Sequence, residues 1–135
     1  MPESPAQPAA EVEPSTRGSS PTFATALCCI DGRIQGPLAD FVRTRFGVDY
    51  VDTVTRPGLV GRLDSGVEAD VAISIRAHRS LGIVVSGHAS CAGYSGEESA
   101  QREACRAAAA RLGELWGEME IVPVWVALNG SVELL

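Results

Sequence analysis

The sequence predicts an α/β protein with a mostly parallel β-sheet and helices on both faces. From Phe23 onward, short β-compatible apolar runs alternate with segments of helical periodicity, in the order β-α-β-α-β-α-β. The Asn129-Gly130 pair after the last run is a strong hairpin signal. We therefore expect about four parallel strands followed by a short antiparallel strand at the C-terminal end.

The strands are predicted from apolar runs that are bounded by turn residues. These runs, and the short strand that turns back after the hairpin, cover residues 22–30, 48–55, 83–87, 120–128 and 131–135. The run "IVVSG" is apolar on both faces, as a central strand of a covered sheet should be. Pro123 indicates a sheet edge or the start of a strand, because proline cannot donate a hydrogen bond to a neighbouring strand.

The helices are predicted over residues 36–47, 64–82 and 95–119. Pro37 near the start and Gly47 at the end bound the first helix. Ser95 is the expected N-cap of the third, which carries acidic residues in its first turn. His78 and Arg79, near the end of the second helix, suit the negative end of the helix dipole.

The N-terminal segment differs in composition from the rest of the chain. Residues 1–21 hold five of the eight prolines and almost no large apolar side chain. Such a segment buries too little surface to offset its ordering entropy, which predicts a disordered tail. We expect one folded domain over residues 22–135, and a docking role for the tail is the less favoured alternative.

Charge and hydropathy exclude several classes of protein. The net charge is −6 and no basic stripe is present, so we expect no nucleic-acid binding. No apolar run reaches the roughly 20 residues that a membrane span needs. The N-terminus also lacks the pattern of a secretory signal, which predicts a cytoplasmic protein with reduced cysteines.

Two segments rich in reactive side chains follow the first and third predicted strands. "CCIDGR" begins at Cys28, and "GHASCAG" contains His88 and Cys91. In a parallel sheet the carboxyl ends of strands share one edge, where ligands usually bind. Zn²⁺ favours thiolate and imidazole together, so Cys29, His88 and Cys91 are the predicted zinc ligands.

The alternation of side chains along the first strand separates its two cysteines. A period of two places Cys29, Asp31 and Arg33 on one side and Cys28 on the other, with Cys28 left as the alternative ligand. Asp31 can act as a conditional fourth ligand and close the site. If Arg33 holds Asp31 away, water can bind, and Asp31 can orient it or take its proton.

The combination of "CIDGR" and "GHASCAG" resembles the β-class carbonic anhydrases over residues 23–127. The resemblance implies that family's fold, a zinc cofactor held by Cys29, His88 and Cys91, and Asp31 with Arg33 as a catalytic dyad. It further implies that a zinc-bound hydroxide hydrates carbon dioxide reversibly to bicarbonate, in a homodimer or higher homo-oligomer. Gly32 and Ala92 stand where the family usually has serine and glycine.

Other interpretations of these residues remain open. The protein can be a zinc hydrolase of carbonyl sulfide or carbon disulfide, or a zinc module with a structural or sensing role. Cys29 and Cys91 can also be buried thiols and His88 a loop histidine without a metal, and Cys105 is expected to pack as a small residue. Tyr94 can face the site or pack. Residues 56–61 are expected to form a simple turn, although Arg56 or backbone amides there could line the site. The two tryptophans, Trp116 and Trp125, are expected in the core or a subunit interface.

Overall fold

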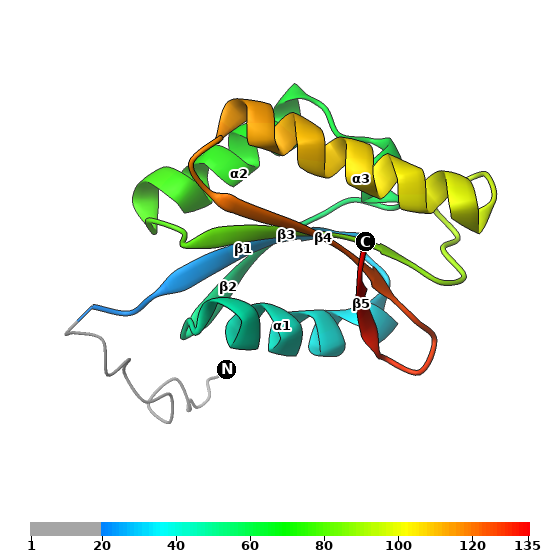
Figure 1. The fold of residues 1–135 in the computed structure, drawn as a ribbon, viewed down its shortest axis with the longest axis horizontal. Coiled ribbons are helices and arrows are strands. Elements are labelled where there is room, and N and C mark those ends of the chain that lie inside the picture. Colours follow the sequence, from blue (N-terminus) through cyan, green and yellow to red (C-terminus); the bar gives the residue numbers. More distant parts are fainter. Residues whose placement is uncertain (1–19) are drawn as a thin grey trace, which may run out of the picture.

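The computed structural model describes residues 20–135, which form a five-stranded sheet in the order β2-β1-β3-β4-β5 (Figure 1). The first four strands are parallel, and β5 is antiparallel to β4. This is the predicted fold class. The elements along the chain are β1 (Phe23–Cys28), α1 (Gly32–Phe46), β2 (Tyr50–Thr55), the 3₁₀ helix η2 (Leu59–Gly61), α2 (Ser65–Ala77), β3 (Gly82–His88), α3 (Glu98–Leu115), β4 (Glu120–Val126) and β5 (Val132–Leu134).

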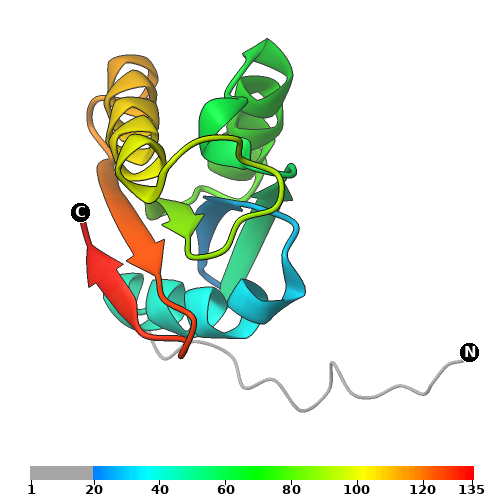
Figure 2. The ribbon, with the colours of Figure 1, turned by 90° about the vertical axis from the view of Figure 1, so that its right-hand side faces the viewer.

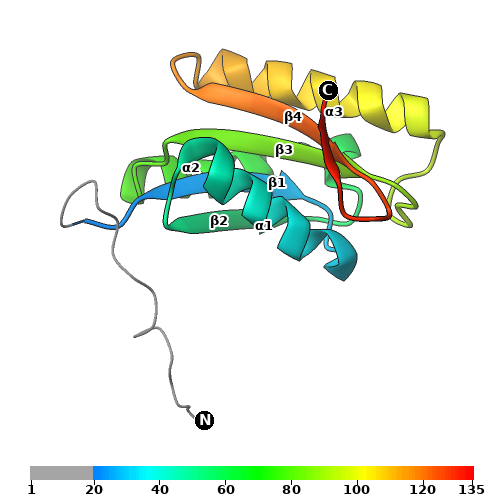
Figure 3. The ribbon, with the colours of Figure 1, turned by 60° about the horizontal axis from the view of Figure 1, so that its bottom comes forward.

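Helices cover both faces of the sheet. Helix α1 lies on one face, and α2 and α3 lie side by side on the other (Figures 1 and 2). Figure 3 shows α1 crossing the front of the sheet. Ile34, Leu38 and Val42 of α1 pack against one face, while Val67, Val71 and the inner side of α3 pack against the other. Every residue of β3 is buried, as predicted for a central strand.

Helix α1 begins four residues earlier than predicted. Asp31 is its N-cap, and the Asp31 carboxylate accepts a hydrogen bond of 2.9 Å from the backbone N–H of Arg33. Pro37 therefore lies inside the helix and not at its start. The error has a physical cause: a proline in a helical pattern indicates a start, but a stronger cap stands six residues before it.

The other two helices are shorter than predicted. Helix α2 ends at Ala77 with His78 as its C-cap, and Arg79 adopts a left-handed φ of 54° that stops the helix. Helix α3 begins at Glu98, because Gly96 has a φ of 138° and turns the chain after Ser95. The hairpin signal at Asn129-Gly130 is confirmed, since β5 returns antiparallel to β4.

Pro123 does not mark an edge along the whole of β4. Strand β4 lies between β3 and β5, but β5 pairs only with Val124 to Val126. Pro123 stands directly before this paired stretch, and its carbonyl accepts a bond from Leu135 N–H. The missing N–H of the proline is therefore tolerated where β4 passes from an edge to an interior strand.

Buried hydroxyl groups join β1 to α2 and to the turn before β3. Thr25 Oγ1 donates to Ser80 Oγ at 2.7 Å and lies 2.7 Å from Ser74 Oγ. Ser74 Oγ also donates to Asp52 of β2, and Ser80 donates to the carbonyl of Gly82. Thr25 is completely buried, so its hydroxyl depends on these partners.

Two loops at the carboxyl edge of the sheet touch through glycines. A Cβ atom added to Gly93 would lie 2.6 Å from the nitrogen of Gly58, and one added to Gly58 would lie 2.3 Å from the carbonyl oxygen of Gly93. Gly58 also has a left-handed φ of 59°. The loops after β2 and β3 can therefore approach this closely only because both residues lack a side chain.

Two predictions concern the ends and the surroundings of the chain. The tail predicted for residues 1–21 lies outside the described residues except for Ser20 and Pro21, and the domain boundary at residue 22 stays a prediction. Within residues 20–135, none of the helices combines the length and the apolar character needed to cross a membrane.

Replacing Thr25 by valine should lower the free energy of unfolding by about 1–3 kcal/mol, because the buried Ser74 and Ser80 hydroxyls each lose a partner. Urea denaturation measures this change. The matched control is Thr53→Val on the exposed side of β2, which should shift stability by less than about 0.5 kcal/mol. Equal effects of the two substitutions would contradict the role given to Thr25.

Replacing Gly93 by alanine should separate the two loops, since the new methyl group would lie against the backbone of Pro57 and Gly58. We expect a loss of about 1–3 kcal/mol in unfolding free energy, measured by urea denaturation. Gly36→Ala is the control, because nothing lies within 4 Å of its added Cβ in α1. That variant should gain up to about 1 kcal/mol. A fully stable Gly93→Ala protein would show that the contact is not needed.

Candidate metal centre

Three of the residues predicted as zinc ligands converge at the carboxyl edge of the sheet. Cys29 follows the last residue of β1, His88 ends β3, and Cys91 lies in the loop after it. One ligand atom from each lies within 4.8 Å of the other two, and the two Sγ atoms are 3.8 Å apart. Strands β1 and β3 are parallel neighbours in the sheet, so the segments that follow them lie side by side.

The backbone of the loop after β2 supports Cys29. The N–H of Gly58 donates to Cys29 Sγ at 3.3 Å, and Cys29 is only 5% exposed. The Gly58 N–H is thus a fixed hydrogen-bond donor to the sulfur atom that would bind a metal. The segment 56–61 is therefore not only a simple turn. The backbone N–H of Gly58 lines the site, as the alternative prediction for this segment stated.

His88 is arranged as a metal ligand would be. Its Nδ1 lies 2.8 Å from the carbonyl oxygen of Ala89, which can only accept, so in the neutral ring Nδ1 carries the proton and Nε2 has the free lone pair. His88 as a residue is 1% exposed. In residues 20–135, His88 Nε2 is the one enclosed side-chain nitrogen or oxygen atom without a hydrogen-bond partner. Leaving such an atom unpaired costs about 1–3 kcal/mol.

Cys91 is the most exposed of the three. Burial raises the pKa of its thiol, and the backbone N–H groups of Gly93 and Tyr94 oppose that effect. Those two amides donate to the sulfur from the same loop, two and three residues after Cys91.

The donor set suits zinc. Two sulfur atoms and one neutral imidazole nitrogen are ligands that Zn²⁺ accepts in tetrahedral sites with one open position. The unpaired Nε2 of His88 is explained if an ion occupies the space between these atoms. The residues present therefore fit the metal, and the assignment of Cys29, His88 and Cys91 as its ligands stays a prediction.

Asp31 and Arg33 form the expected pair. Arg33 Nε donates to Asp31 Oδ1 at 3.0 Å, and Nη2 donates to Oδ2 at 2.7 Å. Nη2 also lies 3.3 Å from the carbonyl oxygen of Ser90, between the two ligands of the second segment. These side-chain hydrogen bonds, and that from Arg33 N–H, hold the pKa of the Asp31 carboxyl well below its usual range.

The reason why Asp31 and Arg33 meet differs from the predicted one. Strand β1 ends at Cys28, so strand alternation does not extend to residues 29–33. The start of α1 brings the two side chains together, because Asp31 caps the helix. Asp31 does not belong to the group of ligand atoms around Cys29 that could hold a metal ion. Its carboxylate is bound to Arg33 instead.

Cys28 lies apart from the cluster. Its Sγ donates to Gln35 Oε1 at 3.8 Å, and burial raises the pKa of its thiol to about 11. The amide nitrogen of Gln35 in turn donates to the carbonyl oxygens of Cys29 and Asp31, at 2.9 Å each. Gln35 therefore fixes the turn between β1 and α1.

Two cavities share the residues of the cluster. One, of about 360 Å³, is lined by Cys29, Ile30, Asp31, Pro57, Ala92 and Gly93. The other, of about 260 Å³, is lined by His88, Ser90, Cys91, Ala92, Tyr94, Gly96, Glu98, Gln101 and Trp125. Tyr94 both packs against the core and borders the second cavity, so the two interpretations of this residue hold together.

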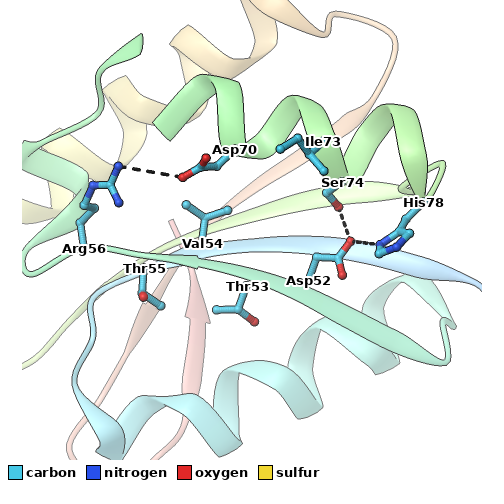
Figure 4. A pocket seen from close by; sticks show the side chains of 9 residues that line it. All are labelled: Asp52, Thr53, Val54, Thr55, Arg56, Asp70, Ile73, Ser74 and His78. Atoms are coloured by element: carbon cyan, nitrogen blue, oxygen red, sulfur yellow. Dashed lines mark hydrogen bonds and ion pairs between the residues drawn. The ribbon is translucent and has the colours of Figure 1, made fainter. Parts of the chain in front are cut away.

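A larger cavity, of about 380 Å³, lies elsewhere, between β2 and α2 (Figure 4). All of its charged side chains, with Ser74, are paired with one another: Asp52 Oδ2 lies 2.6 Å from His78 Nδ1 and accepts from Ser74, and Arg56 lies 3.9 Å from Asp70. Because these groups are already paired, we assign this cavity a structural role.

Sequence reasoning missed the glycines that shape the centre. Gly58 supplies an N–H to Cys29, and Gly93 makes room for it. The signal available was the pair of glycines in two loops at the same sheet edge, but only the fold shows that the loops touch. Of the remaining predictions, Cys105 and Trp125 are buried, and Trp116 is partly buried against the core.

Solved structures of carbonic anhydrases share this fold, whereas no curated protein matches the chain. A carbonic anhydrase from Streptococcus mutans is 19% identical, with a TM-score of 0.60 over 91% of this chain and 83% of that one. One of two tetrameric β-carbonic anhydrases from Sordaria macrospora is 16% identical, with a TM-score of 0.56 over 88% of this chain and 82% of that one.

A family model described as "Putative carbonic anhydrase" matches residues 19–135. The match includes every element of the sheet and both segments that carry the cluster. It agrees with the fold shared with the β-carbonic anhydrases. The chain therefore belongs to this carbonic anhydrase family.

Proposed function

We propose that the protein is a zinc enzyme that reversibly hydrates carbon dioxide to bicarbonate, with Cys29, His88 and Cys91 as the zinc ligands. The observation that supports this most is the enclosed, unpaired Nε2 of His88 beside two thiols. Family membership and fold support the reaction class. When bound, zinc would act as a Lewis acid that lowers the pKa of a coordinated water toward ~7.

The paired carboxylate and guanidinium are the proposed catalytic dyad. Arg33 binds both carboxylate oxygens of Asp31 and so keeps them from becoming a fourth ligand. Asp31 then presents an ionised carboxylate at the cavity that it shares with Cys29, where it can accept a hydrogen bond from water and orient it.

The cavity beside Cys29 suits a small substrate without charge. Ile30, Pro57 and Ala92 give it apolar walls, and its volume of about 360 Å³ exceeds what carbon dioxide needs. Carbon disulfide and carbonyl sulfide are linear and apolar as well, so activity with these compounds belongs in the same assay.

The remaining expectations extend the same proposal. A homodimer or higher homo-oligomer is proposed, and a tetrameric protein stands among the similar structures. A cytoplasmic location also stays a prediction. The competing function is a zinc module in which Asp31 closes the site, but the bidentate bond from Arg33 favours the open arrangement.

Cys29→Ser should weaken zinc binding by more than about 100-fold. Removing a group that only supports a metal ligand already lowers the affinity by about 10–100-fold, and removing the ligand itself should lower it further. The readouts are zinc content and stopped-flow hydration of carbon dioxide on one preparation. Cys28→Ser is the matched control: it changes the neighbouring thiol, which bonds Gln35, and should retain zinc. Zinc loss in Cys28→Ser alone would reverse the ligand assignment. Wild-type protein that binds zinc but adds no rate over buffer between about pH 7 and 9 would refute the enzyme.

Arg33→Met should release the Asp31 carboxylate and lower the hydration rate by about 100-fold or more. X-ray absorption of the zinc-loaded variant should then show an added carboxylate oxygen in place of water. Arg43→Met provides the control, because Arg43 makes a similar bond to Asp40 on the exposed side of α1. Unchanged coordination and rate in Arg33→Met would show that Asp31 is held by other contacts.

A further inference from the structure

The second cavity of the centre contains a buried polar side chain that the proposed reaction does not yet use. Gln101 of α3 lines this cavity of about 260 Å³ together with His88 and Cys91. Gln101 is only 5% exposed, so it counts among the few buried polar residues of the described chain.

The amide of Gln101 has no hydrogen-bond partner within residues 20–135, in contrast to the amide of Gln35. Yet His88 Nε2 is the one fully enclosed side-chain nitrogen or oxygen without a partner in that range. The amide atoms of Gln101 must therefore reach open space. Because the residue is almost entirely buried, that space is the cavity that it lines.

Packing alone does not explain a glutamine at this position. Gln101 belongs to the buried stripe of α3, which continues with Cys105, Ala108 and Leu112. An amide placed there needs hydrogen-bond partners that an apolar side chain would not need, and within residues 20–135 the protein supplies none. The chain therefore keeps a polar group where the core favours an apolar one.

Neighbouring residues fix the stem of this side chain. A Cβ added to Gly87 would lie 3.0 Å from the ring of Trp125 and 3.6 Å from Cγ of Gln101. Glycine directly before His88 thus makes room for both side chains against β3. The Arg102 guanidinium stacks 4.4 Å above the Trp125 ring and keeps that ring in place.

Glu98, the carboxylate that lines the cavity, is already paired with Arg102. Arg102 donates to Glu98 at 2.9 Å and to Glu133 at 3.2 Å. Its guanidinium is committed to these carboxylates, and Gln101 is the one side chain among the residues that line the cavity with both N–H donors and a carbonyl acceptor.

We propose that Gln101 binds bicarbonate at the metal centre, its amide N–H donating to a carboxylate oxygen and its carbonyl accepting the O–H. A glutamine amide offers one acceptor and two donors side by side, which matches an anion that has both acceptors and one O–H. Carbon dioxide has no donor, so Gln101 is a residue that recognises bicarbonate specifically. This inference rests on the proposed function.

The test measures bicarbonate binding separately from turnover. Wild type, Gln101→Met and Gln101→Glu are loaded with cobalt(II), and bicarbonate is titrated while the visible absorption of the cobalt is recorded. Methionine keeps the unbranched shape without donors, and glutamate keeps the shape but repels an anion. Glu103→Leu on the exposed side of α3 is the control.

We expect wild type and Glu103→Leu to bind bicarbonate equally, and Gln101→Met to bind it about tenfold more weakly, since a hydrogen bond to a charged group is worth that factor. Gln101→Glu should bind it more weakly still. The thermal midpoint of Gln101→Met should be unchanged or raised, because the buried amide is removed, whereas a merely structural glutamine would lower it on substitution.

The outcomes separate this inference from the function on which it rests. Affinity of both Gln101 variants within threefold of wild type would overturn the inference alone. So would cobalt-loaded wild type that shows no response to bicarbonate. If cobalt-loaded wild type binds bicarbonate through Gln101 but hydrates no carbon dioxide, the role of Gln101 in binding stands and the proposed enzymatic function is refuted. A chain that takes up no cobalt or zinc would remove both.

Discussion

The contact between the backbones of Gly58 and Gly93 is the constraint on which the metal centre depends. It brings the loop after β2 close enough for its N–H to reach Cys29 Sγ at 3.3 Å. The same loop closes one side of the apolar cavity through Pro57. A side chain at either glycine would push the two loops apart, and the cysteine would lose its backbone donor. The site is therefore held by main-chain packing as much as by its reactive side chains.

The sequence was sufficient for the fold and for the set of residues that meet. Strand β3 could be identified because it is apolar on both faces, and parallel strands necessarily end at one edge. Cys29, His88 and Cys91 could be predicted together because thiol and imidazole groups follow two strands that such a sheet places side by side. These inferences rest on periodicity and topology, which short segments already contain.

Finer features depended on contacts that leave no pattern in the sequence. Pro37 suggested the start of α1, yet Asp31 caps the helix earlier, and only the backbone shows which signal prevails. The donation from Gly58 comes from an amide that every residue except proline has. Gln101 lies in a helix whose pattern predicts packing, and its unpaired amide becomes visible only when its neighbours are known.

The N-cap position of Asp31 couples the proposed dyad to the integrity of a helix. The carboxylate that pairs with the Arg33 guanidinium also accepts the backbone N–H of Arg33 in the first turn of α1. Any movement of Asp31 toward a metal would release that N–H and fray the turn, at about 1 kcal/mol for a lost cap. The stability of the first turn of α1 therefore opposes movement of Asp31 into the metal site. Sequence changes in that turn would raise or lower this opposition without altering any of the proposed zinc ligands.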